Sequence, residues 1–192
     1  PALLGYPDQP LMDRARQAAA CWIGWRGLEI AADQIVLTAG AHAGLQSLLA
    51  ILSATHSTVL TEAHSFPGIK ALAGLSGLRL RGVPCDAEGL IPEALEQTAR
   101  ASGATVVIAV PNLQNPSGAI MGAARRRAIA EVITRCELTL IEDDIYGSFT
   151  PERPLVCELS GAHIYLSSLS KSVSPALRFG FIAGRHPLVA KL

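Results

Sequence analysis

The chain has 192 residues, 49% of them hydrophobic, and 16 Lys and Arg residues balance 16 Asp and Glu residues. This length suits a single domain, and the charge balance excludes the basic excess with which proteins bind nucleic acid or anionic membranes. Apolar runs stay far below the ~20 residues needed to span a bilayer.

Taken in chain order, apolar runs rich in β-branched residues alternate with helix-like segments. We expect helices near 41–53, 67–76, 92–102 and 122–135, and in the last of these Ile129, Val132 and Ile133 recur at helical spacing. Strands are expected at 34–39, 57–62, 78–83, 104–110, 138–143, 162–167 and 179–184. This alternation predicts a three-layer α/β fold, a mostly parallel seven-stranded sheet with helices on both faces.

Polar segments follow five of the expected strands. They are "TAGAH" (38–42), "EAHSFPG" (62–68), "PNLQNPSG" (111–118), "EDDIYG" (142–147) and "SSLSK" (167–171). In parallel sheets, ligands bind beyond the carboxyl ends of the strands. We therefore expect the five segments to form one site.

Two cations stand close together in "SSLSKSVSPALRFGFIAG" (167–184), namely Lys171 and Arg178. A free lysine has a pKa of ~10.4, and desolvation beside another cation lowers it to about 7–8, where the amine becomes a nucleophile. The segment therefore favours a reactive lysine beside an anion-binding arginine. The alternative is a surface lysine in a serine-rich loop.

Three other segments suit the chemistry of an aromatic heterocycle. The Asn115-Pro116 turn presents an amide that can bind a phenolate-like oxygen, although it can also be a plain β-turn. Asp143 and Asp144 end an apolar strand, where a carboxylate can pair with a protonated ring nitrogen. Exposed loop acids or a magnesium-binding pair are the alternatives. Gly40 opens a helix whose free N–H groups can bind an anion.

Together and in this order, these motifs resemble the large domain of fold-type I pyridoxal-phosphate enzymes of aminotransferase class I/II. The resemblance covers nearly the whole chain and is carried by "PNLQNPSG", "EDDIYGSF" and "SSLSKSVSPALRFGFIAG". Within that group, "LGYPDQP", "GLEIAADQIVLTAGAHAGLQSLL" and "EDDIYGSF" are most similar to the aminotransferase-like domains of GntR/MocR-type transcriptional regulators.

The resemblance implies a role for individual residues toward pyridoxal 5'-phosphate. Lys171 forms the Schiff base with the cofactor aldehyde, and Asp143 pairs with the pyridine nitrogen. Tyr146 and Asn115 bond to the phenolic oxygen, and Phe66 stacks on the ring. The residues implied for the phosphate are Gly40, Ala41, His42, Ser168, Ser170 and Arg178, whose guanidinium is a better partner for phosphate than a lysine amine.

Several positions depart from the pattern of the group. Ala39 replaces a common hydroxyl residue, His42 replaces a common glutamine, and Phe66 replaces the usual tyrosine. Tyr6 stands where relatives have a tyrosine that reaches a partner subunit's phosphate, but Leu11 follows it where they usually have glycine. The first two departures are expected to weaken the cofactor's binding.

The resemblance also bears on domains and partners. Residues 1–192 match the large domain, so we expect a chain without the smaller C-terminal domain and without the N-terminal winged helix-turn-helix of regulators. Such a fragment should bind pyridoxal phosphate weakly or variably and transaminate little by itself. The implied partners are an amino acid or amine, as substrate or effector, and a second copy of the chain. We expect no direct contact with nucleic acid and no contact with membrane.

Two functions share the predicted site: the sensor domain of a transcriptional regulator and a metabolic aminotransferase. A cofactor-free dimerisation module is a third possibility. A serine acyl-enzyme with Ser168 as nucleophile and Lys171 as base is a fourth, but its partner motifs S-D-N and K-T-G do not occur in the sequence.

The four cysteines and the first residues of the chain indicate the compartment. The cysteines are scattered without a C-x-x-C pair, which is typical of reduced thiols and gives no metal site. Residues 1–16, "PALLGYPDQPLMDRAR", contain prolines and charges where a signal peptide has an apolar run. We expect a cytoplasmic protein.

Overall fold

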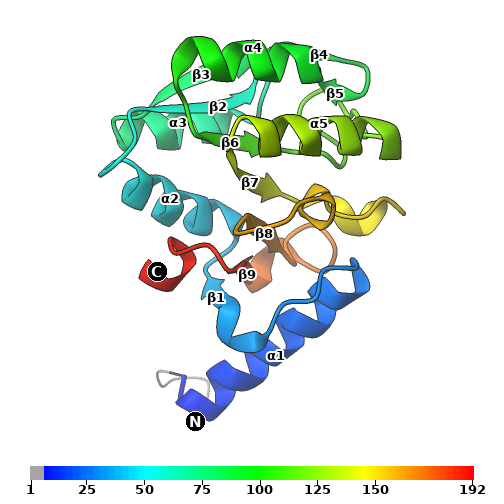
Figure 1. The fold of residues 1–192 in the computed structure, drawn as a ribbon. Helices are drawn as coiled ribbons and strands as arrows, with labels where there is room; N and C mark the ends of the chain where they lie inside the picture. The colour runs from blue at the N-terminus through cyan, green and yellow to red at the C-terminus, as the bar shows by residue number, and fades with distance from the viewer. Residues whose placement is uncertain (1–6) are drawn as a thin grey trace.

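The structure, a computed structural model, describes residues 7–192. Its centre is a seven-stranded sheet in the order β1-β9-β8-β7-β6-β2-β3 (Figure 1). The strands are β1 Ile35–Thr38, β2 Thr58–Glu62, β3 Arg79–Val83, β6 Val106–Ala109, β7 Thr139–Asp143, β8 Ile164–Ser168 and β9 Gly180–Ala183. Neighbours from β3 to β8 pair in parallel, whereas β9 is antiparallel to both β8 and β1. The prediction of a mostly parallel seven-stranded sheet is confirmed.

Helices cover both faces of this sheet, which confirms the three-layer prediction. Helices α2 (Ala41–Leu52) and α3 (Pro67–Leu75) contribute to the hydrophobic cluster on one face. Helices α1 (Gln9–Trp25), α4 (Pro92–Ser102) and α5 (Ala123–Arg135) contribute to the cluster on the other. Because both faces are covered, strands β6 and β8 are buried along their whole length, and the sequence of β6 (Val-Val-Ile-Ala) is continuously apolar rather than alternating.

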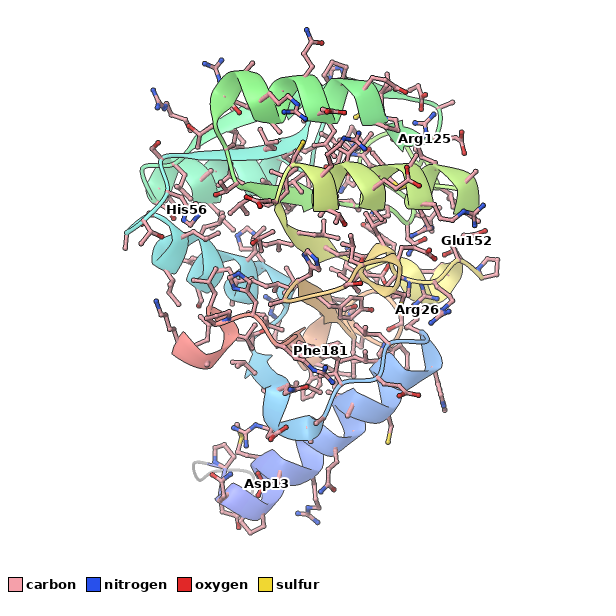
Figure 2. All side chains as sticks on the ribbon, in the orientation of Figure 1. Asp13, Arg26, His56, Arg125, Glu152 and Phe181 are labelled. Carbon is pink, nitrogen blue, oxygen red and sulfur yellow. The ribbon has the colours of Figure 1, made fainter. Side chains whose placement is uncertain are left out.

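Helix α1 is an element that the sequence analysis did not predict. The Asp8 carboxylate caps its first turn by accepting a hydrogen bond from the Leu11 N–H (2.9 Å), and Pro10 also lies in that turn. Proline is compatible with the first turn of a helix, because the N–H that it lacks has no helical partner there. Ala19 and Ile23 of α1 are buried against the sheet, together with Phe181 of β9, which is labelled in Figure 2.

Other features are smaller. The hairpin of β4 (Cys85–Asp86) and β5 (Gly89–Leu90) was also not predicted. Single 3-10 turns occupy Ala32–Gln34, Gly147–Phe149, Leu155–Glu158, Pro175–Leu177 and Val189–Lys191. The four cysteines are free thiols, and Cys85 and Cys136 pack against the core. Within residues 7–192, the helices are too short or too polar to cross a bilayer.

The topology gathers the polar segments at one edge of the sheet. Strands β1, β2, β6, β7 and β8 run in one direction and end at this edge, and β9 starts there because it runs the opposite way. The segments after these five strands, and the segment before β9, therefore meet. Tyr6, at the position where relatives have a tyrosine that reaches a partner subunit's phosphate, lies outside the described residues.

Candidate functional site

A cavity of about 390 Å³ lies at this edge of the sheet. Its wall is formed by the segments that follow β1, β2, β6, β7 and β8. The predicted site residues that line it are Ala41, His42, Phe66, Asn115, Asp143, Tyr146, Ser168, Ser170, Lys171 and Arg178. The eleventh predicted residue, Gly40, is in close contact with the guanidinium of Arg178. A Cβ added to Gly40 would lie 2.9 Å from Nη2 of Arg178.

The end of the cavity near Arg178 is suited to an anion. The Arg178 guanidinium donates a hydrogen bond from Nη2 to the Ala39 carbonyl (2.9 Å), which holds it beside the start of α2. Gly40 caps this helix with φ of 90°, a conformation that favours glycine. The first N–H groups of α2 have no partner within the helix and carry the positive end of its dipole. Ser168 Oγ accepts a hydrogen bond from the Ser170 N–H (3.3 Å) on the same wall.

Lys171 lies in the same cavity, with its Nζ 5.9 Å from the centre of the Tyr146 ring. Lys171 and Arg178 are both exposed. The expectation that burial within this chain removes water from the Lys171 amine is therefore wrong. The loop after β8 presents Lys171 at the mouth of the cavity, and the aromatic ring of Tyr146 is the neighbour that attracts its charge.

The carboxyl group of Asp143 lies on the inner wall and is 8% exposed. Its Oδ1 accepts a hydrogen bond from the Ile145 N–H (3.3 Å). Burial raises the pKa of Asp143 to about 6, against the lowering effect of that hydrogen bond. Asp143 is therefore mostly ionised at pH 7, and its carboxylate can hold a proton on a basic ring nitrogen.

The alternative that the two adjacent acids are exposed loop acids is wrong, because both side chains are buried. Asp144 is 1% exposed, does not line the cavity, and accepts hydrogen bonds from Asn112, Tyr165 and Arg26. Within the described residues, no group of three or more His, Cys, Asp or Glu side chains could hold a metal ion. The two acids thus have different environments, one facing the cavity and one turned away from it.

Phe66 and His42 form an aromatic wall of the cavity. The two rings meet edge to face, with centroids 6.2 Å apart and an angle of 78° between their planes. Phe66 also packs against Gly68, where any Cβ would collide with the ring. Phe66 is thereby held with part of its surface open, 37% of it exposed, and is available to stack on a planar ligand.

Two hydrogen bonds that the sequence analysis missed hold the loop around Asn115. The buried carboxyl group of Glu62, at the end of β2, accepts a hydrogen bond from the Val110 N–H (2.6 Å). Gln114 donates from Nε2 to the His64 carbonyl (2.6 Å). The loop after β6 is thus fixed to the loop that carries Phe66. A sequence signal existed for Glu62, because a charged residue directly after a buried apolar strand needs a partner.

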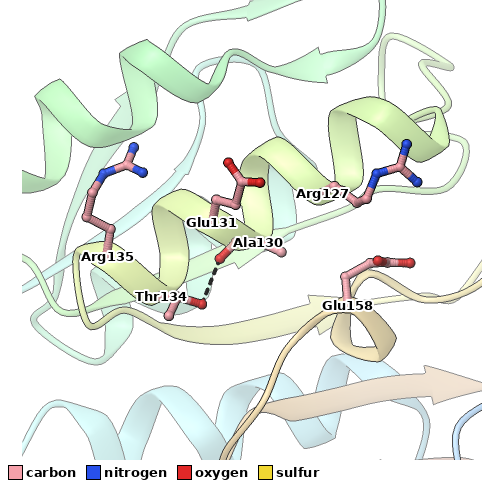
Figure 3. A pocket seen from close by; sticks show the side chains of 6 residues that line it. All are labelled: Arg127, Ala130, Glu131, Thr134, Arg135 and Glu158. Atoms are coloured by element: carbon pink, nitrogen blue, oxygen red, sulfur yellow. Dashed lines mark hydrogen bonds between the residues drawn. The ribbon is translucent and has the colours of Figure 1, made fainter.

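A second hollow, of about 570 Å³, lies between α5 and the 3-10 turn Leu155–Glu158 (Figure 3). Its charged side chains have both signs: Arg127 and Arg135 oppose Glu131 and Glu158. Arg135 is already engaged, since it donates from Nη2 to Glu96 (2.6 Å). This hollow contains no predicted site residue, and its balanced charges select no ligand.

The cavity at the sheet edge, in contrast, matches a definite kind of ligand. It offers cationic and N–H groups at one end, a buried carboxylate at the inner wall, an aromatic face and an accessible amine. These groups fit a planar heterocycle that carries a phosphate, a basic ring nitrogen and a carbonyl carbon.

The sequence profile of the family described as "Aminotransferase class I and II" matches residues 1–192. The chain belongs to this family. It is 32% identical to the uncharacterised HTH-type transcriptional regulator YisV of Bacillus subtilis, over 98% of the chain and 40% of that protein. It is 30% identical to the 2-aminoadipate transaminase of Thermus thermophilus, over 92% of the chain and 45% of that protein.

Solved structures agree with this membership. The chain is similar to LysN, an α-aminoadipate aminotransferase from Thermus thermophilus solved with N-(5'-phosphopyridoxyl)-L-leucine, with a TM-score of 0.83 and 28% identity. The match covers 99% of the chain and 50% of LysN, so the chain spans about half of each of these proteins. It is an aminotransferase-like domain of fold type I, and the family implies pyridoxal phosphate as its cofactor.

Proposed function

We propose that the chain binds pyridoxal phosphate in the cavity at the sheet edge, with Lys171 bonded covalently to the cofactor aldehyde. When bound, the cofactor supplies an electron sink that stabilises negative charge on the α-carbon of an amino substrate. The observation that carries the proposal is the meeting of Lys171, Arg178 and Asp143 in one cavity, although they come from different loops.

Arg178 binds the phosphate together with the N–H groups of Ala41 and His42 and the hydroxyl groups of Ser168 and Ser170. A phosphate ester carries nearly two negative charges, and a planar guanidinium can offer two parallel hydrogen bonds to it. The position of Arg178 against Gly40 and the Ala39 carbonyl directs it toward the start of α2.

The remaining side chains orient the ring and move protons. The Asp143 carboxylate, ionised above a pH of about 6, keeps the ring nitrogen protonated. Asn115 and Tyr146 bond to the phenolic oxygen, and Phe66 packs on the ring face. With an amino substrate in the cavity, the Lys171 amine would be the base that accepts its α-proton.

Borohydride trapping tests the covalent bond. After pyridoxal phosphate is added to the purified chain, we expect a visible absorption band that borohydride removes, and mass spectrometry should locate the reduced adduct on Lys171. Lys171→Ala should abolish the adduct, whereas Lys70→Ala, a control at an exposed lysine of α3, should leave it intact. An adduct that persists on Lys171→Ala would refute the assignment.

The phosphate role of Arg178 has its own test. Arg178→Gln keeps most of the side-chain length and removes the charge, and losing a charged hydrogen bond costs roughly 1.5–3 kcal/mol. The dissociation constant for the cofactor should therefore rise about tenfold or more. Arg185→Gln, at an exposed arginine outside the cavity, is the control. Equal affinities of the two variants would count against Arg178.

The biological role that we propose is that of a cytoplasmic, homodimeric sensor domain of a transcriptional regulator. The similarity to the HTH-type regulator YisV supports this role, with the DNA contact made by another domain. A metabolic aminotransferase is the second candidate, supported by the similarity to 2-aminoadipate transaminase. Operator binding by the complete protein that responds to pyridoxal phosphate would favour the sensor. Amino-group transfer to a 2-oxo acid without DNA binding would favour the enzyme.

A further inference from the structure

The carboxylate of Asp144 is the centre of a buried group of hydrogen bonds on the side of the sheet away from the cavity. Asn112 Nδ2 donates to its Oδ1 (2.7 Å), and the Tyr165 hydroxyl donates to its Oδ2 (2.8 Å). Arg26 Nε also reaches Oδ2 (3.3 Å). These donors come from the loop after β6, from β8 and from the end of α1, so one carboxylate joins three separate elements to β7. We call these four residues the Asp144 clamp.

The donors of the clamp are themselves held. The Arg26 guanidinium also donates to the carbonyl groups of Thr150 (3.2 Å) and Glu152 (2.6 Å); Arg26 and Glu152 are labelled in Figure 2. Asn112 is fully buried, and its Oδ1 accepts hydrogen bonds from Arg126 Nη2 (2.7 Å) and the Thr150 hydroxyl (3.2 Å). Arg26 and Asn112 are therefore each held by further hydrogen bonds.

Asp144 has no freedom to move. Its N–H donates to the Leu166 carbonyl (2.9 Å), and its own carbonyl accepts a hydrogen bond from the Ser167 hydroxyl (2.9 Å). A Cβ on Gly147 would collide with the carboxylate, so the main chain closes over it. The position of this residue is fixed through both its backbone and its side chain.

Two residues of the cavity depend on this fixed point. Asp143 is its neighbour in the chain and lines the cavity, and Asn115 follows Asn112 by three residues in the same loop. We infer that Asp144 is a positioning residue, which acts through Asn112 to hold Asp143 and Asn115 at the spacing that a bound cofactor needs. This inference rests on the proposed function and assigns a role to a group that does not touch the cofactor.

Glu142 provides a matched control, because it is also a fully buried acid. Asp143 lines the cavity, and Glu142, the residue before it in β7, points to the opposite face of the sheet. Its carboxyl group accepts hydrogen bonds from the N–H groups of Leu155 and Val156 (2.8 Å each), which belong to a turn outside the cavity. Both acids support the fold and both adjoin Asp143 in the chain, but of the two only Asp144 accepts a hydrogen bond from Asn112 in the loop that carries Asn115.

The first measurement is cofactor binding by Asp144→Asn and Glu142→Gln. In Asp144→Asn a single accepting oxygen replaces two, so an amide N–H faces either Asn112 or the pair Arg26 and Tyr165, and at least one buried donor loses its acceptor. We expect about a tenfold or larger rise in the dissociation constant for pyridoxal phosphate, together with a shift in the pH midpoint of the visible band of the bound cofactor. Glu142→Gln should lower the melting temperature without either change.

Tyr165→Phe is a milder variant, for use if Asp144→Asn does not fold. It removes a single hydroxyl donor, and we expect a shift of the pH midpoint in the same direction. An unshifted midpoint and unchanged affinity in the folded clamp variants would overturn the inference. Changes of equal size in Glu142→Gln would also overturn it, because they would show a general effect of lost stability.

Hydrogen exchange of the protein without added cofactor separates this inference from the proposed function. The N–H groups of Gly118 and Met121 are bonded within the Asn115 loop, to the carbonyl groups of Gln114 and Pro111. Asp144→Asn should speed their exchange about tenfold relative to the core, whereas Glu142→Gln should speed exchange at Leu155 and Val156. If the unmodified chain binds no cofactor, the proposed function fails. The exchange measurement still tests the positioning role of Asp144, because unchanged exchange rates at Gly118 and Met121 would refute it.

Discussion

Glu62 gives a prediction that can be worked through from its surroundings. Its carboxyl group is 2% exposed and accepts hydrogen bonds from the Val110 N–H and the Thr61 hydroxyl. Burial raises the pKa of Glu62 from 4.5 to about 7, and the nearby Asp143 adds to the increase. The folded protein therefore keeps this proton at a pH where the unfolded chain has lost it. Stability must fall as the pH rises through this range and level off above a pH of about 7.

The magnitude follows from these two pKa values. Applying the linkage relation between pH 5 and pH 8.5 gives a loss on the order of 2–3 kcal/mol in the free energy of unfolding from this one group. Glu62→Gln keeps an oxygen that can accept the Val110 N–H but carries no titratable proton. The variant should therefore lack this part of the pH dependence. Its free energy of unfolding should change less between pH 5 and pH 8.5 than that of the unmodified chain, so the comparison between the two proteins should move in favour of the variant at pH 8.5.

Urea denaturation at both pH values, with reductant to protect the four free thiols, measures this difference. Glu96→Gln is the control. The Glu96 side chain is partly exposed at the surface, and hydrogen bonds from Arg135 and Arg100 lower its pKa to about 2, so it stays ionised across the range. If Glu62→Gln loses as much stability between pH 5 and pH 8.5 as the unmodified chain, the protonated, buried state of Glu62 is refuted.

Three further outcomes are expected. Gly147→Ala should destabilise the fold by about 1–3 kcal/mol in thermal denaturation, because its Cβ collides with the Asp144 carboxylate, and an unchanged melting temperature would contradict this contact. Phe181→Ala should cost about 3–5 kcal/mol, since Phe181 is fully buried between β9 and α1; a loss below 1 kcal/mol would mean that the face is not packed. His163 Nδ1 accepts a hydrogen bond from the Leu140 N–H (3.2 Å), and burial lowers the pKa of His163. The free energy of unfolding should therefore fall as the pH falls below 6.5, and it should fall less in His163→Gln. Equal acid sensitivity of the two proteins in urea denaturation would contradict the last prediction.

Much of the fold follows from local patterns. The strands predicted at 138–143 and 162–167 form at Thr139–Asp143 and Ile164–Ser168, and the helix predicted at 92–102 forms at Pro92–Ser102. These elements are clear in the sequence because burial on both faces of the sheet requires uninterrupted apolar runs. Helix α1 was not predicted, although Pro10 and the Asp8 cap are both compatible with a helix start.

The fold brings the predicted site residues together in one cavity, but the exposure of Lys171 was not predicted. The meeting of Lys171, Arg178 and Asp143 follows from the rule that parallel strands end at one edge. The exposure of Lys171 could not be read from its sequence neighbours, since it depends on how far the loop after β8 extends over the cavity. The roles proposed for these residues remain predictions until the cofactor is bound and trapped.

The sequence alone determined the order along the chain of the seven sheet strands and of helices α2 to α5, the positions of the polar loops and the family to which their motifs point. Each of these depends on residues that are near one another in the chain, such as an apolar run or a turn. The tertiary structure alone decided which groups meet across the chain. Arg26 and Asp144 are 118 residues apart, and Asp143 and Asp144 are adjacent acids that face opposite sides of the sheet. Such contacts depend on how the layers pack, because a buried carboxylate takes the donors that the folded chain brings to it.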